Sequence, residues 1–200
     1  MKLKSLIAAA ALVTASTSFG ATGIFGSYIQ IFTTTNTVYK GESYGSVASI
    51  DGANLGTFNI SDNLGLAQSQ INTFKYDTSD VTGGQMQYRV YLTSGVAGSF
   101  NTVTYGFQNN ATFTNLAGSS VTGGGDQAWG NTTSIDLMAL TSGNGNYTLE
   151  VFFKATTNEG DRFSNNGGSN FKANFTVVPE PGTAALGLVG TALLLRRRRR

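Results

Sequence analysis

Apolar and polar side chains alternate with a period of two through most of the chain, from residue 21 to residue 177. The alternation is clearest over 85–93, 147–155 and 171–177, where every second residue is apolar. A strand that buries one face requires this pattern. The inward side chains are predicted to be Met86, Tyr88, Val90, Leu92, Tyr147, Leu149, Val151, Phe153, Phe171, Ala173, Phe175 and Val177.

Weaker alternation predicts further short strands, and Gly-, Asn- and Ser-rich turns such as 82–84, 122–126 and 142–146 separate them. A short helix is a further option at 62–70. The weaker strands are 26–32, 46–50, 56–60, 71–76, 102–107, 111–116 and 134–140. Many short strands and no long helix predict an all-β domain over 21–177, a single antiparallel β-sandwich of jelly-roll-like type.

The first twenty residues have the pattern of a secretory signal peptide. Lys2 and Lys4 make a short basic start, an apolar Ala-rich run follows over 6–15, and small residues surround Gly20. The Sec translocon and signal peptidase recognise this arrangement, so we expect export through the inner membrane and cleavage after Gly20.

The last twenty-three residues, 178–200, combine three features in a fixed order. The segment contains the block Val178, Pro179, Glu180 and Pro181, an apolar run over 182–195, and the cluster Arg196, Arg197, Arg198, Arg199 and Arg200. The prolines favour an extended backbone. The apolar run predicts a short hydrophobic helix of roughly 21 Å, which is less than a hydrocarbon core of about 30 Å. The arginines are expected to stay on the cytoplasmic side as a membrane anchor.

This order of features resembles the PEP-CTERM sorting signal of exosortase-containing Gram-negative bacteria. The resemblance covers 178–200 alone. It implies that an exosortase, a membrane-embedded cysteine protease or transpeptidase, processes the tail near the Pro-Glu-Pro block after transient insertion in the inner membrane. It also implies delivery to the cell surface or an extracellular, exopolysaccharide-containing matrix. An ordinary basic tail anchor is the alternative, although such an anchor needs no Pro-Glu-Pro block and is usually longer.

The two ends dominate the basic charge of the chain. All 200 residues carry 13 bases and 11 acids, a net charge of +2. Seven of the bases are Lys2, Lys4 and the five terminal arginines, which leaves the body with six bases, 11 acids and a net charge of −5. The mildly acidic segment between the two ends therefore lacks the excess of basic residues that binding to nucleic acid requires.

The body also lacks the residues of common catalytic sites. The chain has no cysteine and no histidine, which excludes thiolate nucleophiles, histidine bases and Cys/His zinc sites. A carboxylate-dependent glycan hydrolase or lyase would need two acids about 5–10 Å apart, and the sequence spacing selects no such pair. We therefore predict no catalytic activity. No cofactor is predicted, although the loops 77–80 and 158–161 could supply oxygen ligands to calcium.

A structural or adhesive role is the leading prediction for the body, and carbohydrate binding is the alternative. Trp129, the single tryptophan, is expected in a polar loop over 125–131, and exposed aromatic rings can stack on sugars. Tyr91 and Phe152 lie on the polar sides of their segments. Residues 147–177 also resemble, weakly, the last hairpin of starch-binding modules, through Phe163 and the Asn-Asn-Gly-Gly sequence that follows it. The candidate ligand-binding residues are Trp129, Asp126, Asn165 and Asn166.

Overall fold

The computed structural model of the protein describes residues 21–43 and 45–180. The predicted signal peptide, Pro181, the apolar run and the five terminal arginines lie outside the described residues. Val178 ends the last strand, and Pro179 and Glu180 follow it as exposed residues.

Strands make up most of the described residues, and the helical elements among them are two 3-10 turns, η1 (Met138–Leu140) and η2 (Asn166–Gly168). The strands are β1 (Thr22–Phe32), β2 (Asn36–Ser43), β3 (Asn54–Asn59), β4 (Gly65–Lys75), β5 (Val81–Leu92), β6 (Asn101–Asn110), β7 (Phe113–Thr114), β8 (Ser120–Val121), β9 (Asp126–Asn131), β10 (Ile135–Asp136), β11 (Gly145–Thr157), β12 (Arg162–Ser164) and β13 (Phe171–Val178). The all-β prediction is confirmed. The helix considered at 62–70 is wrong, because β4 occupies most of that segment.

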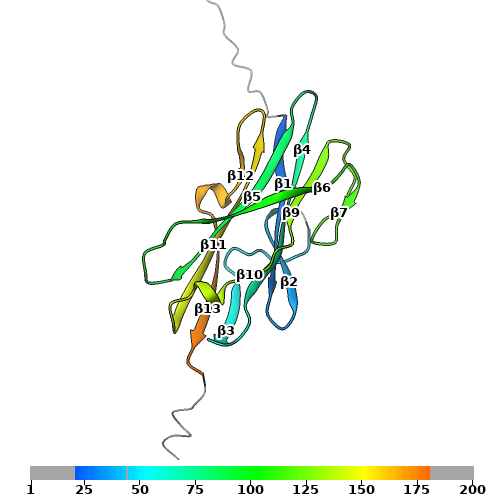
Figure 1. The fold of residues 1–200 in the computed structure, drawn as a ribbon. Helices are drawn as coiled ribbons and strands as arrows, with labels where there is room; N and C mark the ends of the chain where they lie inside the picture. The colour runs from blue at the N-terminus through cyan, green and yellow to red at the C-terminus, as the bar shows by residue number, and fades with distance from the viewer. Residues whose placement is uncertain (1–20, 44, 181–200) are drawn as a thin grey trace, which may run out of the picture.

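The main sheet has the strand order β2-β1-β4-β9-β6-β5-β11-β13-β3 (Figure 1), and it curls around the larger of two clusters of buried apolar residues. Strand β6 joins two halves, since its first part pairs with β5 and its second part with β9. We call β2, β1, β4 and β9 the β1 half, and β5, β11, β13 and β3 the β11 half. Strand β10 pairs with β4, β12 pairs with β11, and β7 and β8 form a separate hairpin.

One strand pair departs from the predicted antiparallel arrangement. Strands β3 and β13 are parallel, while the other strand pairs in the described part of the chain are antiparallel. A parallel pair needs a long connection instead of a hairpin, and more than a hundred residues separate these two strands. The sheet is therefore mostly antiparallel, and the prediction of an entirely antiparallel sheet is wrong at this edge.

Residues 48–53 connect the edge strand β2 to β13 without forming a strand of their own. The amide of Ile50 donates to the Lys40 carbonyl at 2.8 Å, and the amide of Gly52 donates to the Lys172 carbonyl at 2.7 Å. The strand predicted at 46–50 is thus a bridging segment. Likewise, only residues 113–114 of the strand predicted at 111–116 pair, and the segment 134–140 contains a two-residue strand followed by η1.

The inward side chains of the three clearest strands form the centre of the core. Those of β11 and the four apolar positions of β13 are all buried, and so are Met86 and Tyr88 of β5. Val90 is half-buried, and Leu92 is exposed because it lies where β5 ends. The inward prediction is therefore confirmed except at the end of β5. Alternation also places Thr148 and Glu150 on the outward face of β11, but both are buried there and not exposed to solvent.

Candidate functional site

Trp129 lies in a strand and not in the predicted loop. The glycines at 123–125 make the turn before β9, which then pairs with β4 on one side and β6 on the other. The side chain is 9% exposed and belongs to the main core cluster. Its ring meets Phe107 edge-on at a centroid distance of 5.3 Å. Trp129 therefore offers no open ring face for a sugar.

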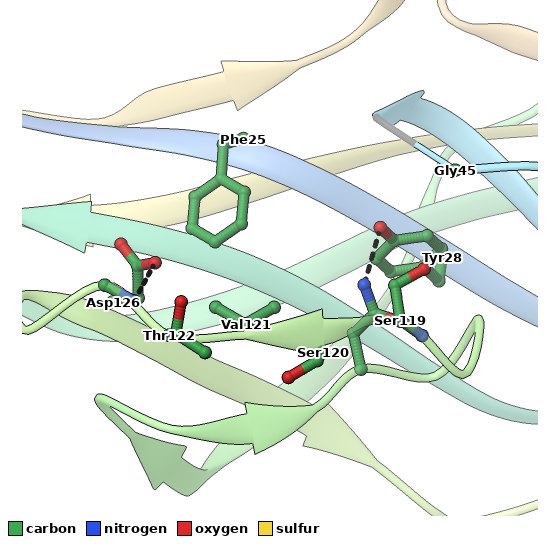
Figure 2. A pocket seen from close by; sticks show the side chains of 10 residues that line it. Phe25, Tyr28, Gly45, Ser119, Ser120, Val121, Thr122 and Asp126 are labelled. Atoms are coloured by element: carbon green, nitrogen blue, oxygen red, sulfur yellow. Dashed lines mark hydrogen bonds between the residues drawn. The ribbon is translucent and has the colours of Figure 1, made fainter.

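Asp126, at the start of the same strand, lines a pocket of about 310 Å³ between β1 and the β7–β8 hairpin (Figure 2). Phe25 and Asp126 lie at one end of the pocket and Tyr28 at the other. The Asp126 carboxylate accepts a hydrogen bond from the Gly123 amide at 3.2 Å, and Asn115 Nδ2 donates to the Tyr28 hydroxyl at 3.0 Å. The volume is at the lower end of the range for ligand pockets, about 300–1,000 Å³.

The pocket offers no pair of acids for hydrolysis. Asp126 is the only acid among the described residues that line it. General acid–base cleavage of a glycosidic bond needs two carboxyl groups. The geometry around Asp126 is that of a small open pocket between β1 and the β7–β8 hairpin, with one acid in its lining.

Asn165 and Asn166 shape the turn between β12 and β13. The Asn165 side chain accepts a hydrogen bond from the Gly168 amide at 3.1 Å, and Asn166 Nδ2 donates to Asp51 Oδ2 at 3.1 Å. Asn166 has a φ of 52°, and the two glycines after it also have positive φ, which glycine adopts without steric cost. This turn belongs to the β11 half, so the structure does not bring its two asparagines together with Asp126 and Trp129.

The two loops considered for calcium do meet, at the ends of β4, β5 and β11. Asn158 Oδ1 accepts from the Asp80 amide at 2.8 Å. However, Asp80 pairs with Lys75 at 2.6 Å, Asp161 pairs with Lys154 at 2.8 Å, and Glu159 pairs with Arg162 at 3.0 Å. Among the residues of known placement, no group of three or more Asp, Glu, His or Cys side chains is arranged to hold a metal ion.

Basic and hydroxyl partners stabilise the charged forms of these loop carboxylates. The hydrogen bond from Lys75, with the charge of its ammonium group, holds the pKa of Asp80 below its usual value. The Ser79 hydroxyl, helped by Thr22 and Arg162, likewise lowers the pKa of Glu159. At least one carboxylate oxygen of each of Asp80, Glu159 and Asp161 is thus already engaged by the chain's own donors.

Glu150 is a buried carboxylate on the outer side of the β11 half. It is 3% exposed. Its Oε2 accepts from Arg89 Nη2 at 2.9 Å and from the Tyr91 hydroxyl at 3.0 Å, while its Oε1 accepts from Asn170 Nδ2 at 2.7 Å. Burial alone would raise the pKa of Glu150, but the hydrogen bonds from Asn170, Arg89 and Tyr91 outweigh burial and lower it. Glu150 is therefore held as a charged structural group.

Arg89 connects this carboxylate to a row of aromatic rings. Its Nη1 donates to the Gly98 carbonyl at 2.9 Å, and its guanidinium lies 4.1 Å from the centroid of the Phe100 ring. Phe100 meets Phe152 edge-on at 5.1 Å, and Phe152 meets Phe163 at 6.4 Å. The row thus begins beside Arg89 and crosses the outer face of the sheet.

We call this surface the Phe152 face and define it by the three rings Phe100, Phe152 and Phe163 with the neighbouring polar residues Gln85, Gln87, Thr102 and Lys154. Phe163 is 50% exposed and the other two rings are half-buried. Strand pairing places Phe152 opposite Gln87, Lys154 opposite Gln85, and Thr102 opposite Gln87 on the other side. The sequence indicated that Phe152 lies on the polar side of its strand. The contact between Phe152 and Phe100, which lies about fifty residues earlier in the chain, could not be predicted from the alternation of apolar and polar residues.

No protein-family model matches the chain, and the search of curated proteins gave no match. Among solved structures, one similar chain is a family 123 glycoside hydrolase from Clostridium perfringens, described as hydrolysing glycolipid glycans, with 11% identity and a TM-score of 0.34. The alignment covers 80% of this chain and 28% of the hydrolase. Another is AggA, the major subunit of aggregative adherence fimbriae type I from Escherichia coli, with 11% identity, a TM-score of 0.24, and coverage of 76% and 95%. Similarity at this level assigns neither family nor function.

Over 21–43 and 45–180, the structure contains no helix that is long and apolar enough to cross a bilayer.

Proposed function

We propose that this chain is an exported, exosortase-sorted protein whose body has a structural or adhesive role at the cell surface or in an exopolysaccharide matrix. The observation that carries the proposal is the order of features over 178–200: a Pro-Glu-Pro block, an apolar run and an arginine cluster. The signal peptide pattern over 1–20 supports it, since export through the Sec translocon must come first. The partners are then the translocon, signal peptidase, the inner membrane and an exosortase.

The position of the block relative to the domain is consistent with processing. The last core residue is Val177, and the exposed Pro179 and Glu180 follow directly after β13. Strand β13 ends at the opposite end of the domain from the start of β1 (Figure 1). A protease could therefore reach the block without unfolding the core. We also infer that the curled sheet is a sandwich of jelly-roll type, with the β1 half and the β11 half as its layers.

Mass spectrometry of the mature protein from the native host tests the sorting proposal. We expect the exported protein to end near the Pro-Glu-Pro block and to lack the five terminal arginines. A Glu180→Ala variant is expected to keep its tail and to accumulate in the inner membrane. The matched control is Lys172→Ala, which removes another exposed charge just upstream. Exported protein that retains Arg200 would contradict the proposal.

Carbohydrate binding is a second candidate, and the Phe152 face favours it more than Trp129 does. A surface ring that is half exposed is available for stacking, whereas a core indole is not. A glycan hydrolase or lyase has less support, because Glu150 is closed off by three donors and Asp126 has no second acid in its pocket.

A further inference from the structure

We propose that the Phe152 face binds a neutral polysaccharide chain, with Phe163 and Phe152 stacking on successive sugar rings. The proposal rests on the proposed delivery of the body to a polysaccharide-containing matrix. The proposed binding residues are therefore those of the Phe152 face and not Trp129 and Asp126. The sequence pattern did not predict that these rings lie together. The inference follows from the shape, the charge and the polar groups of this face.

The rings form a continuous row across neighbouring strands. Phe152 comes from β11 and Phe163 from β12, while Phe100 directly precedes β6. Neighbouring ring centroids lie 5.1 and 6.4 Å apart, with interplanar angles of 81° and 46°, so the three rings contact in sequence without forming one flat plane. The face is the outer surface of a sheet and not an enclosed cavity. An open, elongated apolar row fits a polymer that lies across it better than a single small molecule.

The charges on and beside the face are paired with one another. Arg89 pairs with Glu150 at 2.9 Å, and Lys154 pairs with Asp161 at 2.8 Å. An anionic polymer would have to compete with Glu150 and Asp161 for these two cations. A neutral polymer meets no uncompensated charge, and its binding needs no ion pair to open. Charge complementarity therefore favours a neutral glycan.

Amide and hydroxyl groups beside the rings suit the hydroxyls of a sugar. Gln87 Oε1 accepts a hydrogen bond from the Thr102 hydroxyl at 3.0 Å, which orients its amide nitrogen while leaving that nitrogen free to donate. The side chain of Gln85, two residues earlier on the same side of β5, makes no hydrogen bond to the described residues. Each amide offers both donors and an acceptor, so each can bind a hydroxyl whichever way its hydrogen points.

The buried cluster below the row keeps one end of it in place. Arg89 donates to Glu150, holds the Gly98 carbonyl and packs against Phe100 at the same time. These contacts fix the segment that brings Phe100 beside Phe152. Groups held in the bound arrangement before the ligand arrives lose less entropy on binding. Arg89 is accordingly a positioning residue and does not need to touch the glycan.

A second copy of this chain is the main competing occupant. Three rings that are each at least half covered leave about 100–300 Å² of apolar surface, since an aromatic side chain buries about 150–250 Å² in full. A stable protein interface needs about 1,200–2,000 Å². The row alone is therefore too small for a dimer, whereas sugar stacking uses individual rings.

Affinity electrophoresis of the purified full chain in mild detergent tests the proposal, with soluble starch, mixed-linkage β-glucan and xylan as neutral probes and alginate as the anionic probe. We expect retardation by at least one neutral polymer and little by alginate. Phe163→Ala is expected to weaken that binding about tenfold, the loss of one stacked ring. Tyr76→Ala is the matched control, because Tyr76 is 64% exposed and follows β4 in the β1 half, outside the Phe152 face.

Each outcome decides the matter. Selective loss of binding in Phe163→Ala, with Tyr76→Ala unchanged, supports the proposal. Absence of retardation by all three neutral polymers overturns it, as does equal loss in both variants or stronger binding to alginate. Concentration-dependent self-association that Phe163→Ala abolishes would identify a second copy as the occupant and would also overturn it. The assay is independent of tail processing, so failure here leaves the sorting proposal standing and the reverse also holds.

Discussion

An Arg89→Ala variant is expected to lose about 3–5 kcal/mol of unfolding free energy, which is the usual cost of removing one partner from a buried ion pair. In this variant Glu150 would remain buried without a cationic partner, and only Tyr91 and Asn170 would still donate hydrogen bonds to it. The cost is a large fraction of the roughly 5–15 kcal/mol that holds a typical domain together. Urea denaturation followed by circular dichroism measures the difference.

The matched control for Arg89→Ala is Lys154→Ala, which breaks the pair with Asp161. The acid of that pair is far more exposed, at 37% for Asp161 against 4% for the Glu150 side chain, and exposed pairs contribute about 0–1 kcal/mol. Adding Glu150→Gln to Arg89→Ala removes the buried charge and should recover part of the lost stability. Equal losses of unfolding free energy in Arg89→Ala and Lys154→Ala would show that the Arg89–Glu150 pair contributes no more than an exposed ion pair.

The pH dependence of stability provides a second test of the interaction between Arg89 and Glu150. The pKa of Glu150 in the folded protein is lowered, so its contribution is present above its unfolded pKa and is lost as pH falls through the folded value. The wild type should therefore lose stability as the pH falls below about 4.5. In Arg89→Ala this loss should be smaller, because the lowered pKa depends partly on Arg89.

Trp129→Ala is expected to destabilise the domain by about 3–5 kcal/mol, the typical cost of truncating a buried tryptophan. Its side chain packs in the main core between Phe107 and Ile71, the latter paired with it across β4 and β9. The loss should appear in urea denaturation and not as a specific loss of glycan binding. A Trp129→Ala protein of unchanged stability that fails to bind polysaccharide would contradict this assignment.

Trp129→Phe is the informative companion to Trp129→Ala. The indole Nε1 has no hydrogen-bond partner in the described structure, so phenylalanine removes volume without breaking a hydrogen bond. We expect a clearly smaller loss than for alanine. Phe163→Ala, which truncates an exposed ring, should change stability by about 0.5 kcal/mol or less. The comparison separates core packing from surface recognition.

Local pattern was sufficient for the strands whose two faces differ in polarity. The alternation over 147–155 and 171–177 predicted both the strands and their buried faces, because a side chain's direction in a strand depends only on its position. The pattern was weaker at 46–50 and 111–116, where the segments form only an isolated bridge to Lys40 or a two-residue strand in a separate hairpin. Trp129 was misplaced because the glycines before it indicate a turn equally well in front of a loop or a strand.

The sequence by itself determined the all-β class, the inward residues of the strongest strands, the charge asymmetry between ends and body, and the ordered tail on which the sorting proposal depends. Each of these is a local property of the chain. Only the tertiary structure decided that Glu150 is buried, that Trp129 belongs to the core, and that Phe100 joins Phe152 and Phe163. Those results depend on contacts between residues far apart in sequence, because strand order and the folding of loops over the sheet decide which outward positions stay in water.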